Sequence, residues 1–254
     1  MDGGVTRSSY RSSAGMEILR TFAFALVIAL FIRTFLFQPF NIPSGSMENT
    51  LLVGDYLFVS KFSYGYSNYS FPWSPNLFSG RILRGEPQRG DVVVFRLPAR
   101  PWEDYIKRLV GLPGDRIQMI DGVLYINGAP CKLERVDDYV ETQSGGVERH
   151  VPRFRESFPD GSTHYVLDRR PDNPGADDTQ EFVVPPGHYF MMGDNRDNSN
   201  DSRIADSGVG FVPEENLVGR ADIIVFSMDD SAQLWQFWKW PWALRHDRYF
   251  GSVD

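Results

Sequence analysis

The sequence predicts a mainly β fold, in which an antiparallel β-sheet core carries an inserted, smaller β-rich subdomain and follows one N-terminal transmembrane helix. Three observations support this. An uncharged apolar segment lies near the N-terminus, short apolar runs separated by turn residues fill the chain from residue 40, and a charged stretch interrupts them at 132–180. Aromatic residues make up 14%, and 23 Gly and 17 Pro favour short strands and turns over a helical bundle.

The N-terminal apolar segment is expected to form a transmembrane helix at residues 18–38. Its uninterrupted part, 22–32, is short compared with the roughly 20 apolar residues that cross the hydrocarbon. Arg33 would therefore lie near the far interface, with its guanidinium among the headgroups. Two alternatives stay open, a buried amphipathic helix and a cleaved secretory signal. The second is weakened because no small-x-small cleavage site precedes Pro39.

Charge and tryptophan content suggest how such a helix would sit. Arg7, Arg11 and Arg20 favour a cytoplasmic N-terminal tail, residues 1–17, with everything after residue 40 outside the cytoplasm. Residues 234–242 hold four of the six tryptophans around one lysine. This composition suits a bilayer interface, and it suits packing at the edge of a domain equally well.

Seven runs after residue 40 are expected to be strands. Asp121 and Gly122 separate two of them and predict a two-residue hairpin turn. Residues 132–180 are charged and turn-rich, with an exposed loop expected at 169–178, and are interpreted as an inserted subdomain or loop region. The β core would then comprise 39–131 and 181–254. The expected strands are 55–62, 91–97, 115–120, 123–128, 181–185, 188–193 and 221–228.

Composition excludes several classes of function. With 26 Lys and Arg against 33 Asp and Glu, the formal net charge is −7, and no basic run suggests a nucleic-acid surface. The single cysteine, Cys131, excludes an intramolecular disulfide and is either a small buried residue or a free thiol. The four histidines show no metal-ligand spacing, so neither a metal nor a cofactor is expected.

Two stretches carry candidate nucleophilic chemistry. In PSGSM at 43–47, Pro43 restricts the backbone and Gly45 permits unusual φ, so a tight turn can present the Ser46 hydroxyl. Such turns are common, and alone this one indicates little. Lys107 lies among apolar neighbours, and because adjacent strand residues point to opposite faces, Lys107 and Arg108 are not expected both to point inward. A buried Lys107 would have a lowered pKa and could accept a hydroxyl proton, whereas a solvated surface lysine could not.

A third stretch, GDNRDNSNDSR at 193–203, is unusually polar for a segment that follows an apolar run. Asn, Asp and Ser bond to local backbone, so a rigid structural loop is its ordinary interpretation. A metal-binding loop is disfavoured because the spacing does not match an EF-hand and Arg196 and Arg203 would oppose a cation.

Together, the three stretches resemble the bacterial type I signal peptidases. SGSM at 44–47, YIKR and GLPGD within 105–115, and the polar block at 193–203 occur in the family's order, and 89–95 and 210–221 resemble its core strands. The resemblance covers roughly 36–128 and 181–228. It implies a membrane-bound serine endopeptidase that cleaves N-terminal signal peptides from secreted precursors, with 39–131 and 181–254 as its catalytic core.

The resemblance also implies roles for individual residues. Ser46 would be the nucleophile and Lys107 the general base, and the Ser46 N–H with the Ser44 hydroxyl would form the oxyanion hole. Ser199 would hydrogen-bond the Lys107 amine and orient it. Two further residues, Asp201 and Arg203, would brace the loop. The substrate-binding side chains would be Phe40, Ile42, Met47, Leu51, Tyr105 and Ile106.

The implied partners are precursor proteins with signal peptides and the lipid bilayer, without nucleic acid, and the enzyme would be monomeric. It would span the bacterial inner membrane once, with its catalytic domain on the periplasmic face. Many relatives have two membrane segments, and one is found here. Glu48 and Asn49 stand where many relatives have apolar or proline residues, and 204–208 is longer than usual, which leaves substrate preference and loop geometry open.

Three rival interpretations are weighed. Self-cleaving repressors share Ser–Lys chemistry, but they carry a DNA-binding helical domain where this chain has an apolar segment. A catalytically silent, membrane-tethered export subunit would not need the Ser–Lys pair. A metalloprotease lacks candidate ligands here.

Overall fold

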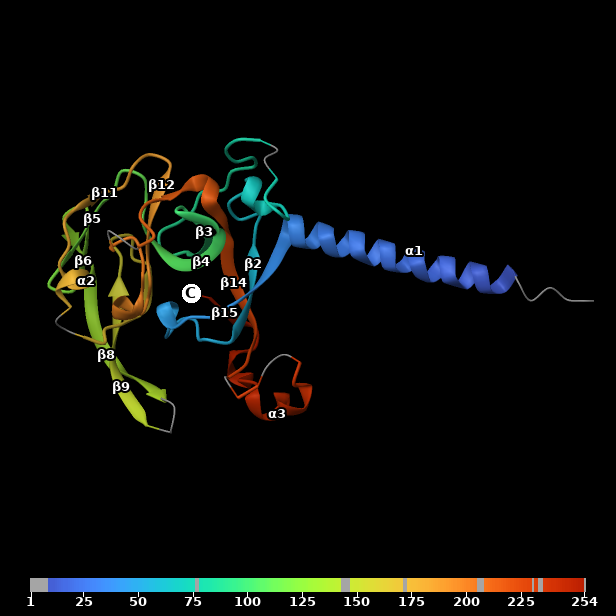
Figure 1. Cartoon of the computed structure of the whole chain (residues 1–254). Helices are drawn as coiled ribbons and strands as arrows, with labels where there is room; N and C mark the ends of the chain where they lie inside the picture. Colours follow the sequence, from blue (N-terminus) through green and yellow to red (C-terminus); the bar gives the residue numbers. More distant parts are fainter. Residues whose placement is uncertain are drawn as a thin grey trace, which may run out of the picture.

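The computed structural model describes residues 9–75, 78–142, 147–170, 173–204, 208–229, 231–232 and 235–253. A long helix, α1 (Ser9–Phe31), projects away from a β-rich body (Figure 1). One π-helical turn, Ile32–Leu36, joins it to the first strand and contains Arg33. Residues Gly15–Leu36 are long and apolar enough to cross a membrane, and their most apolar window is not buried, although Thr34 near the end of the span is.

The helix begins earlier than expected. It starts at Ser9 and not at residue 18, so most of the polar tail predicted at 1–17 is helical, while residues 1–8 lie outside the described part of the chain. Polar residues continue a helix readily once an apolar helix follows them, because propagation is easier than nucleation. The expectation of a buried amphipathic helix is wrong, since the apolar span is exposed.

The body is built on one large antiparallel sheet in the order β1-β2-β14-β3-β4-β12-β13, with β15 beside β14. Its strands are β1 (Phe37–Asn41), β2 (Asp55–Ser60), β3 (Val92–Leu97), β4 (Arg100–Gly111), β12 (His188–Met192), β13 (Val212–Pro213), β14 (Leu217–Ser227) and β15 (Gly251–Ser252).

Both faces of this sheet are covered. Along β3, Val92 and Val94 belong to one buried apolar cluster, whereas Val93 and Phe95 belong to another. Successive side chains of a strand point to opposite faces, so the two clusters lie on the two sides of the sheet. Uninterrupted apolar runs such as VVVF are what a strand buried on both faces requires.

A second sheet, in the order β11-β5-β6-β7, packs beside the first. Asp121 (φ +49°) and Gly122 (φ +73°) connect β5 to β6 between the paired residues Ile120 and Val123. Positive φ at both positions defines the two-residue hairpin turn, and this confirms the predicted hairpin. The strands are β5 (Arg116–Ile120), β6 (Val123–Ile126), β7 (Ala129–Pro130) and β11 (Phe182–Val183).

Residues 132–180 contain a third sheet, in the order β10-β9-β8. Its strands are β8 (Lys132–Thr142), β9 (Glu148–Ser157) and β10 (Thr163–Leu167), and Leu167 meets Asn195 in a parallel bridge. The expected loop at 169–178 contains a short helix, α2 (Pro174–Asp177). The sequence predicted a β-rich insertion here, and this sheet confirms it. The bounds of its three strands were not predicted, because charged residues obscure the period-2 pattern.

The C-terminal segment forms short turns after β14, namely the 3-10 turn Phe237–Lys239, the helix α3 (Trp240–Ala243) and the 3-10 turn His246–Arg248. Trp235 is 63% exposed and Trp242 is 80% exposed, so packing of these two rings into a domain core is excluded. Figure 1 places α3 at the end of the body from which α1 emerges. The remaining 3-10 turns are Gly45–Met47, Asn68–Ser70, Arg196–Asn198 and Glu214–Asn216.

Candidate active site

Ser46 lies on the 3-10 turn Gly45–Met47, between strands β1 and β2. The turn is closed by the Glu48 N–H, which donates to the Gly45 carbonyl at 3.1 Å, and by the Leu51 N–H, which donates to the Met47 carbonyl at 2.8 Å. Met47 and Leu51 are fully buried in the core. The local sequence therefore holds the turn rigidly from below, and the Ser46 hydroxyl projects from it toward β4.

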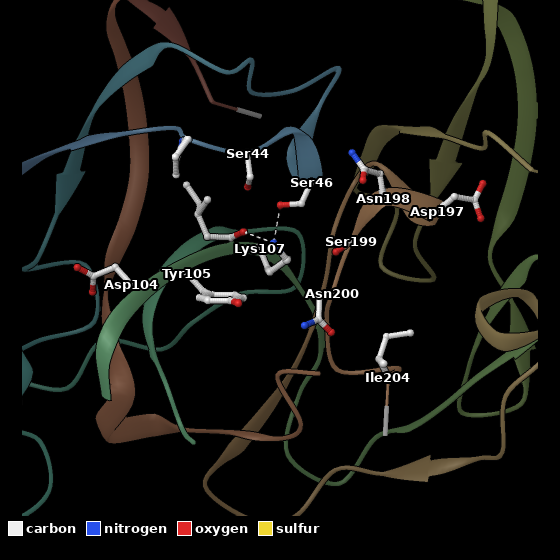
Figure 2. Close-up of a pocket in the computed structure, with 12 residues that line it drawn as sticks. Ser44, Ser46, Asp104, Tyr105, Lys107, Asp197, Asn198, Ser199, Asn200 and Ile204 are labelled. Atoms are coloured by element: carbon white, nitrogen blue, oxygen red, sulfur yellow. Dashed lines mark hydrogen bonds between the residues drawn. The ribbon is translucent and has the colours of Figure 1, made fainter. Parts of the chain in front are cut away.

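Lys107 reaches that hydroxyl from β4. Its Nζ donates to Ser46 Oγ at 2.6 Å and to the Ile106 carbonyl at 3.0 Å, and the side chain is almost fully buried, at 3% exposure. Figure 2 shows the amine pointing at the Ser46 hydroxyl. Burial lowers the Lys107 pKa from 10.5 to about 8, against the opposing effect of Asp201 and Asp194. An appreciable share of the amine is thus neutral slightly above neutral pH.

Arg108 is buried as well, which corrects the expectation that only one of Lys107 and Arg108 could lie inside. The guanidinium pairs with Asp194, with Nε to Oδ1 and Nη2 to Oδ2 both at 2.8 Å. Thr50 Oγ1 also donates to Asp194 at 2.5 Å. The expectation failed because it assumed one solvent-facing side of the strand, whereas both faces of β4 are covered at this point.

The polar block at 193–203 forms the opposite wall of the site. Position 193 has no room for a side chain. A Cβ atom there would lie 2.2 Å from Ser199 Oγ and 2.5 Å from the Ser46 carbonyl oxygen. The Asn195 N–H donates to the same Ser46 carbonyl at 3.2 Å. The block thus directly contacts the turn that carries Ser46.

Asp201 and Arg203 form a buried ion pair within this block. Arg203 Nε and Nη2 donate to the two Asp201 carboxylate oxygens at 3.0 and 2.9 Å, and the Gly193 N–H donates to Asp201 at 3.0 Å. Arg203 Nη2 also donates to the Arg196 carbonyl at 2.6 Å. The charge of Arg203 and these donors hold the Asp201 pKa below its usual value despite burial.

Ser199 lines the site, but its expected hydrogen bond to the Lys107 amine is not formed. Its buried Oγ makes no hydrogen bond of ordinary geometry within the described part of the chain, although the hydroxyl interacts with Asp201 and helps to lower the pKa of that carboxyl. The Lys107 amine is turned instead toward Ser46 and the Ile106 carbonyl. The orienting role of Ser199 stays a prediction.

A cavity of about 680 Å³ opens beside the Ser46–Lys107 pair. Ser44 is exposed at its rim, and Tyr105 and Ile106 line it as expected (Figure 2 labels Ser44 and Tyr105). The sequence did not indicate several other lining residues, because polar loop residues carry no pattern that marks a cavity. They are Pro43, Asp104, Asp197, Asn198, Asn200 and Ile204.

The other expected substrate-binding residues lie elsewhere. Ile42, Met47 and Leu51 are buried in the core cluster and Phe40 packs against it, and none of the four lines the cavity. Apolar residues near a nucleophile turn can serve either a pocket or the core beneath, and the sequence cannot separate these uses. Here they support the turn.

Other reactive groups are not placed for chemistry. Cys131 is buried in an apolar cluster, where burial raises the pKa of its thiol to about 12. Within the described ranges, no three His, Cys, Asp or Glu side chains converge as a metal would require. The arrangement around Ser46 is therefore suited to acyl transfer by a serine activated by an amine.

Comparisons with known proteins agree with this chemistry. The family model described as "Signal peptidase, peptidase S26" matches residues 15–226. Signal peptidase I of Rickettsia conorii is 46% identical over 230 residues, which cover 87% of this chain and 83% of that protein. Signal peptidase I of Rickettsia typhi is 47% identical over 215 residues, or 82% and 78% of the two chains.

One solved structure is also similar. A signal peptidase I from Enterococcus faecalis is 26% identical and covers 53% of this chain and 96% of that one. Its TM-score is 0.31, which is too low to support an inference about the fold.

Proposed function

Since this chain belongs to the signal peptidase family, peptidase S26, we propose that Ser46 and Lys107 are the nucleophile and general base of its reaction. The protein is a serine endopeptidase that removes signal peptides from precursor proteins. The observation that carries the assignment of residues is the 2.6 Å contact between the buried Lys107 Nζ and Ser46 Oγ.

The proposed reaction begins with a neutral Lys107 amine, whose lone pair accepts the proton of the Ser46 hydroxyl. Oγ then attacks the scissile carbonyl carbon, and the tetrahedral intermediate collapses as Lys107 gives that proton to the leaving amine. This leaves the signal peptide esterified to Ser46. A water molecule, deprotonated by Lys107, attacks the ester carbon. The bond from that carbon to Oγ breaks, Oγ takes the proton back from Lys107, and the signal peptide leaves with a new C-terminal carboxylate.

The negative oxygen of each tetrahedral intermediate needs donors. We assign the Ser46 N–H and the Ser44 hydroxyl, because Ser44 directly precedes the turn and is exposed at the rim of the cavity. Donors of this type contribute about 3–4 kcal/mol to transition-state stabilisation in comparable hydrolases. Asp201 and Arg203 would keep the facing loop in place.

The substrate is proposed to bind as an extended strand, with small side chains entering the cavity beside Tyr105 and Ile106. Main-chain hydrogen bonds would supply affinity and the shallow cavity would select small residues. Residues of this size at alternate positions are the pattern of signal-peptide cleavage sites.

The membrane arrangement is also a proposal. Residues Gly15–Leu36 would span the bacterial inner membrane with the N-terminus in the cytoplasm, as Arg7, Arg11 and Arg20 favour, and the body would act as a monomer on the periplasmic face. The exposed Trp235 and Trp242 would contact the bilayer interface. Anchoring enzyme and precursor in one plane raises their effective concentration.

A cleavage assay with a model precursor in detergent or liposomes tests the assignment. Ser46→Ala and Lys107→Met should each abolish processing while their melting temperatures show a folded protein. Lys61→Met is a matched control, because Lys61 is also buried with a pKa lowered to about 8, yet its amine donates to the Ser70 carbonyl. Normal cleavage by either dyad variant would disprove the proposed mechanism.

The assay also separates the rival functions. A serine-reactive probe should label Ser46 in the native protein, which a catalytically silent export subunit would not allow. Activity should persist in a chelator, which a metalloprotease would not allow. Self-cleavage of the chain in place of precursor cleavage would indicate the repressor-like alternative.

A further inference from the structure

Behind the nucleophile turn, three polar side chains contact one another in a closed ring. Arg169 Nη2 donates to Glu48 Oε2 at 2.5 Å, and Arg169 Nε donates to Asn195 Oδ1 at 3.0 Å. Asn195 Nδ2 closes the ring by donating to Glu48 Oε2 at 2.9 Å. The Arg169 and Glu48 side chains are only 11% and 16% exposed, so solvent screens this pair less than a surface pair.

Asn195 links this ring to the backbone of the turn. Its Nδ2 also donates to the Gly45 carbonyl at 2.9 Å, and its N–H donates to the Ser46 carbonyl at 3.2 Å. The side-chain oxygen must face Arg169, which has only donors, and the side-chain nitrogen must face the two acceptors Gly45 and Glu48. Arg169 and Glu48 together therefore fix which way the Asn195 amide points.

The contact at Gly45 acts on the proposed oxyanion hole. The Gly45 carbonyl and the Ser46 N–H belong to one planar trans peptide, in which the two groups point in opposite directions. The hydrogen bond from Asn195 to the Gly45 carbonyl oxygen therefore also fixes the direction of the Ser46 N–H. A donor must meet the developing oxyanion at about 2.7–3.1 Å to be effective, so a small rotation of this peptide matters.

Arg169 does not belong to the catalytic core. It follows β10 of the inserted sheet, and Glu141 of β8 holds its other donors, with Nη1 to Oε2 at 2.7 Å and Nη2 to Oε1 at 3.3 Å. A second contact from the same sheet joins Arg153 Nη1 to Asn49 Oδ1 at 3.1 Å. Side chains of the inserted sheet therefore hydrogen-bond to Glu48 and Asn49, which follow Ser46 closely in the chain.

We infer that Glu48 and Arg169 are positioning residues, through which the inserted sheet orients the Asn195 amide and the peptide that carries the Ser46 oxyanion donor. The inference rests on the proposed function and adds to it a role for the sheet at 132–180. It makes this sheet a determinant of the rate of acyl transfer, with little effect on substrate affinity.

Three variants test the inference with the full-length enzyme and a peptide or precursor substrate. Glu48→Gln and Arg169→Gln should each lower kcat by about tenfold or more, with KM within about twofold of wild type, because alignment and not binding is lost. The kcat of the double variant should be no lower than that of the less active single variant, because both substitutions break the same ring of hydrogen bonds. Glu181→Gln is the matched control, because Glu181 also pairs with an arginine, Arg116, but on an exposed part of the chain beside the four-stranded sheet.

Two measurements separate positioning from general loss of structure. The kcat of each variant is calculated from the concentration of sites that a serine-reactive probe labels, so that unfolded enzyme does not lower the value. The acid limb of the kcat profile should keep its wild-type midpoint in Glu48→Gln, because the ring acts on the turn geometry and not on the charge of Lys107. Arg169→Lys, which keeps the charge but not the fork, should recover part of the loss.

Three outcomes would contradict the positioning role of Glu48 and Arg169. Values of kcat for Glu48→Gln and Arg169→Gln equal to that of Glu181→Gln would overturn the inference, as would a rise in KM at unchanged kcat or a displaced acid limb. Failure of the proposed function would look different, because Ser46→Ala and Lys107→Met would then cleave precursor normally.

Discussion

The Lys107 amine and the Ser46 hydroxyl, 61 positions apart in the chain, lie 2.6 Å from each other, and the lysine side chain is almost fully buried. Lys107 comes from β4, the second strand of the β3–β4 hairpin, and Ser46 comes from the turn between β1 and β2. Their contact depends on the pairing order β1-β2-β14-β3-β4, which brings the turn over β4.

Activity should depend on pH through Lys107. The ammonium form has no lone pair, so kcat/KM should rise with pH through an apparent pKa near 8 and then level off, as burial lowers the Lys107 pKa to about 8. A pH–rate profile on a short peptide substrate measures this. A profile flat between pH 5 and 9 would contradict a lysine base.

The free energy of unfolding should also depend on pH through Lys107. The Lys107 pKa is lower in the folded protein than in the unfolded chain, so the unfolded chain binds more protons and stability rises with pH between about 8 and 10.5. Lys107→Met removes the buried charge and should stabilise the fold at pH 6 by up to about 3 kcal/mol, an advantage that shrinks toward pH 10. Denaturant unfolding at pH 6 and pH 10 tests this, and an inactive variant no more stable than wild type at pH 6 would refute it.

Gly193 should tolerate no side chain. A Cβ atom at this position would lie 2.5 Å from the Ser46 carbonyl oxygen, so Gly193→Ala must push the nucleophile turn away from the loop. We expect kcat/KM to fall by about 100-fold or more, as a displacement near 1 Å commonly causes. Gly175→Ala is the control, because a Cβ there meets nothing within 4 Å. Equal activity of the two variants in a precursor assay would show that the loop and turn are not so tightly packed.

The Arg108–Asp194 pair should matter for stability more than its charges alone suggest. Arg108→Met leaves a fully buried carboxylate without its main partner, so unfolding free energy should drop by about 3–5 kcal/mol. Adding Asp194→Asn removes the stranded charge and should restore part of the loss. Thermal or urea unfolding of the single and double variants gives the comparison, and a double variant less stable than Arg108→Met would argue against this cause.

Much of the fold follows from local sequence. The apolar segment that predicts a membrane helix forms α1, the runs at 55–62 and 91–97 form β2 and β3, and Asp121 with Gly122 forms the predicted turn. These succeed because turn residues and apolar periodicity act over a few neighbouring positions. The β-rich character of 132–180 was expected, but the bounds of its strands were not, since these strands pair mainly with each other and carry many charged residues.

The sequence by itself identified the candidate reactive groups of the site, because Ser46, Lys107 and the polar block at 193–203 lie in short stretches whose residue types resemble one family. Tertiary structure alone decided which of their neighbours support the chemistry. Ile42, Met47 and Leu51 pack beneath the turn and not in the cavity, Arg108 is buried beside Lys107, and Arg169 reaches Glu48 from a distant sheet. These relationships depend on how separate segments pack, and packing leaves no local trace in the order of the residues.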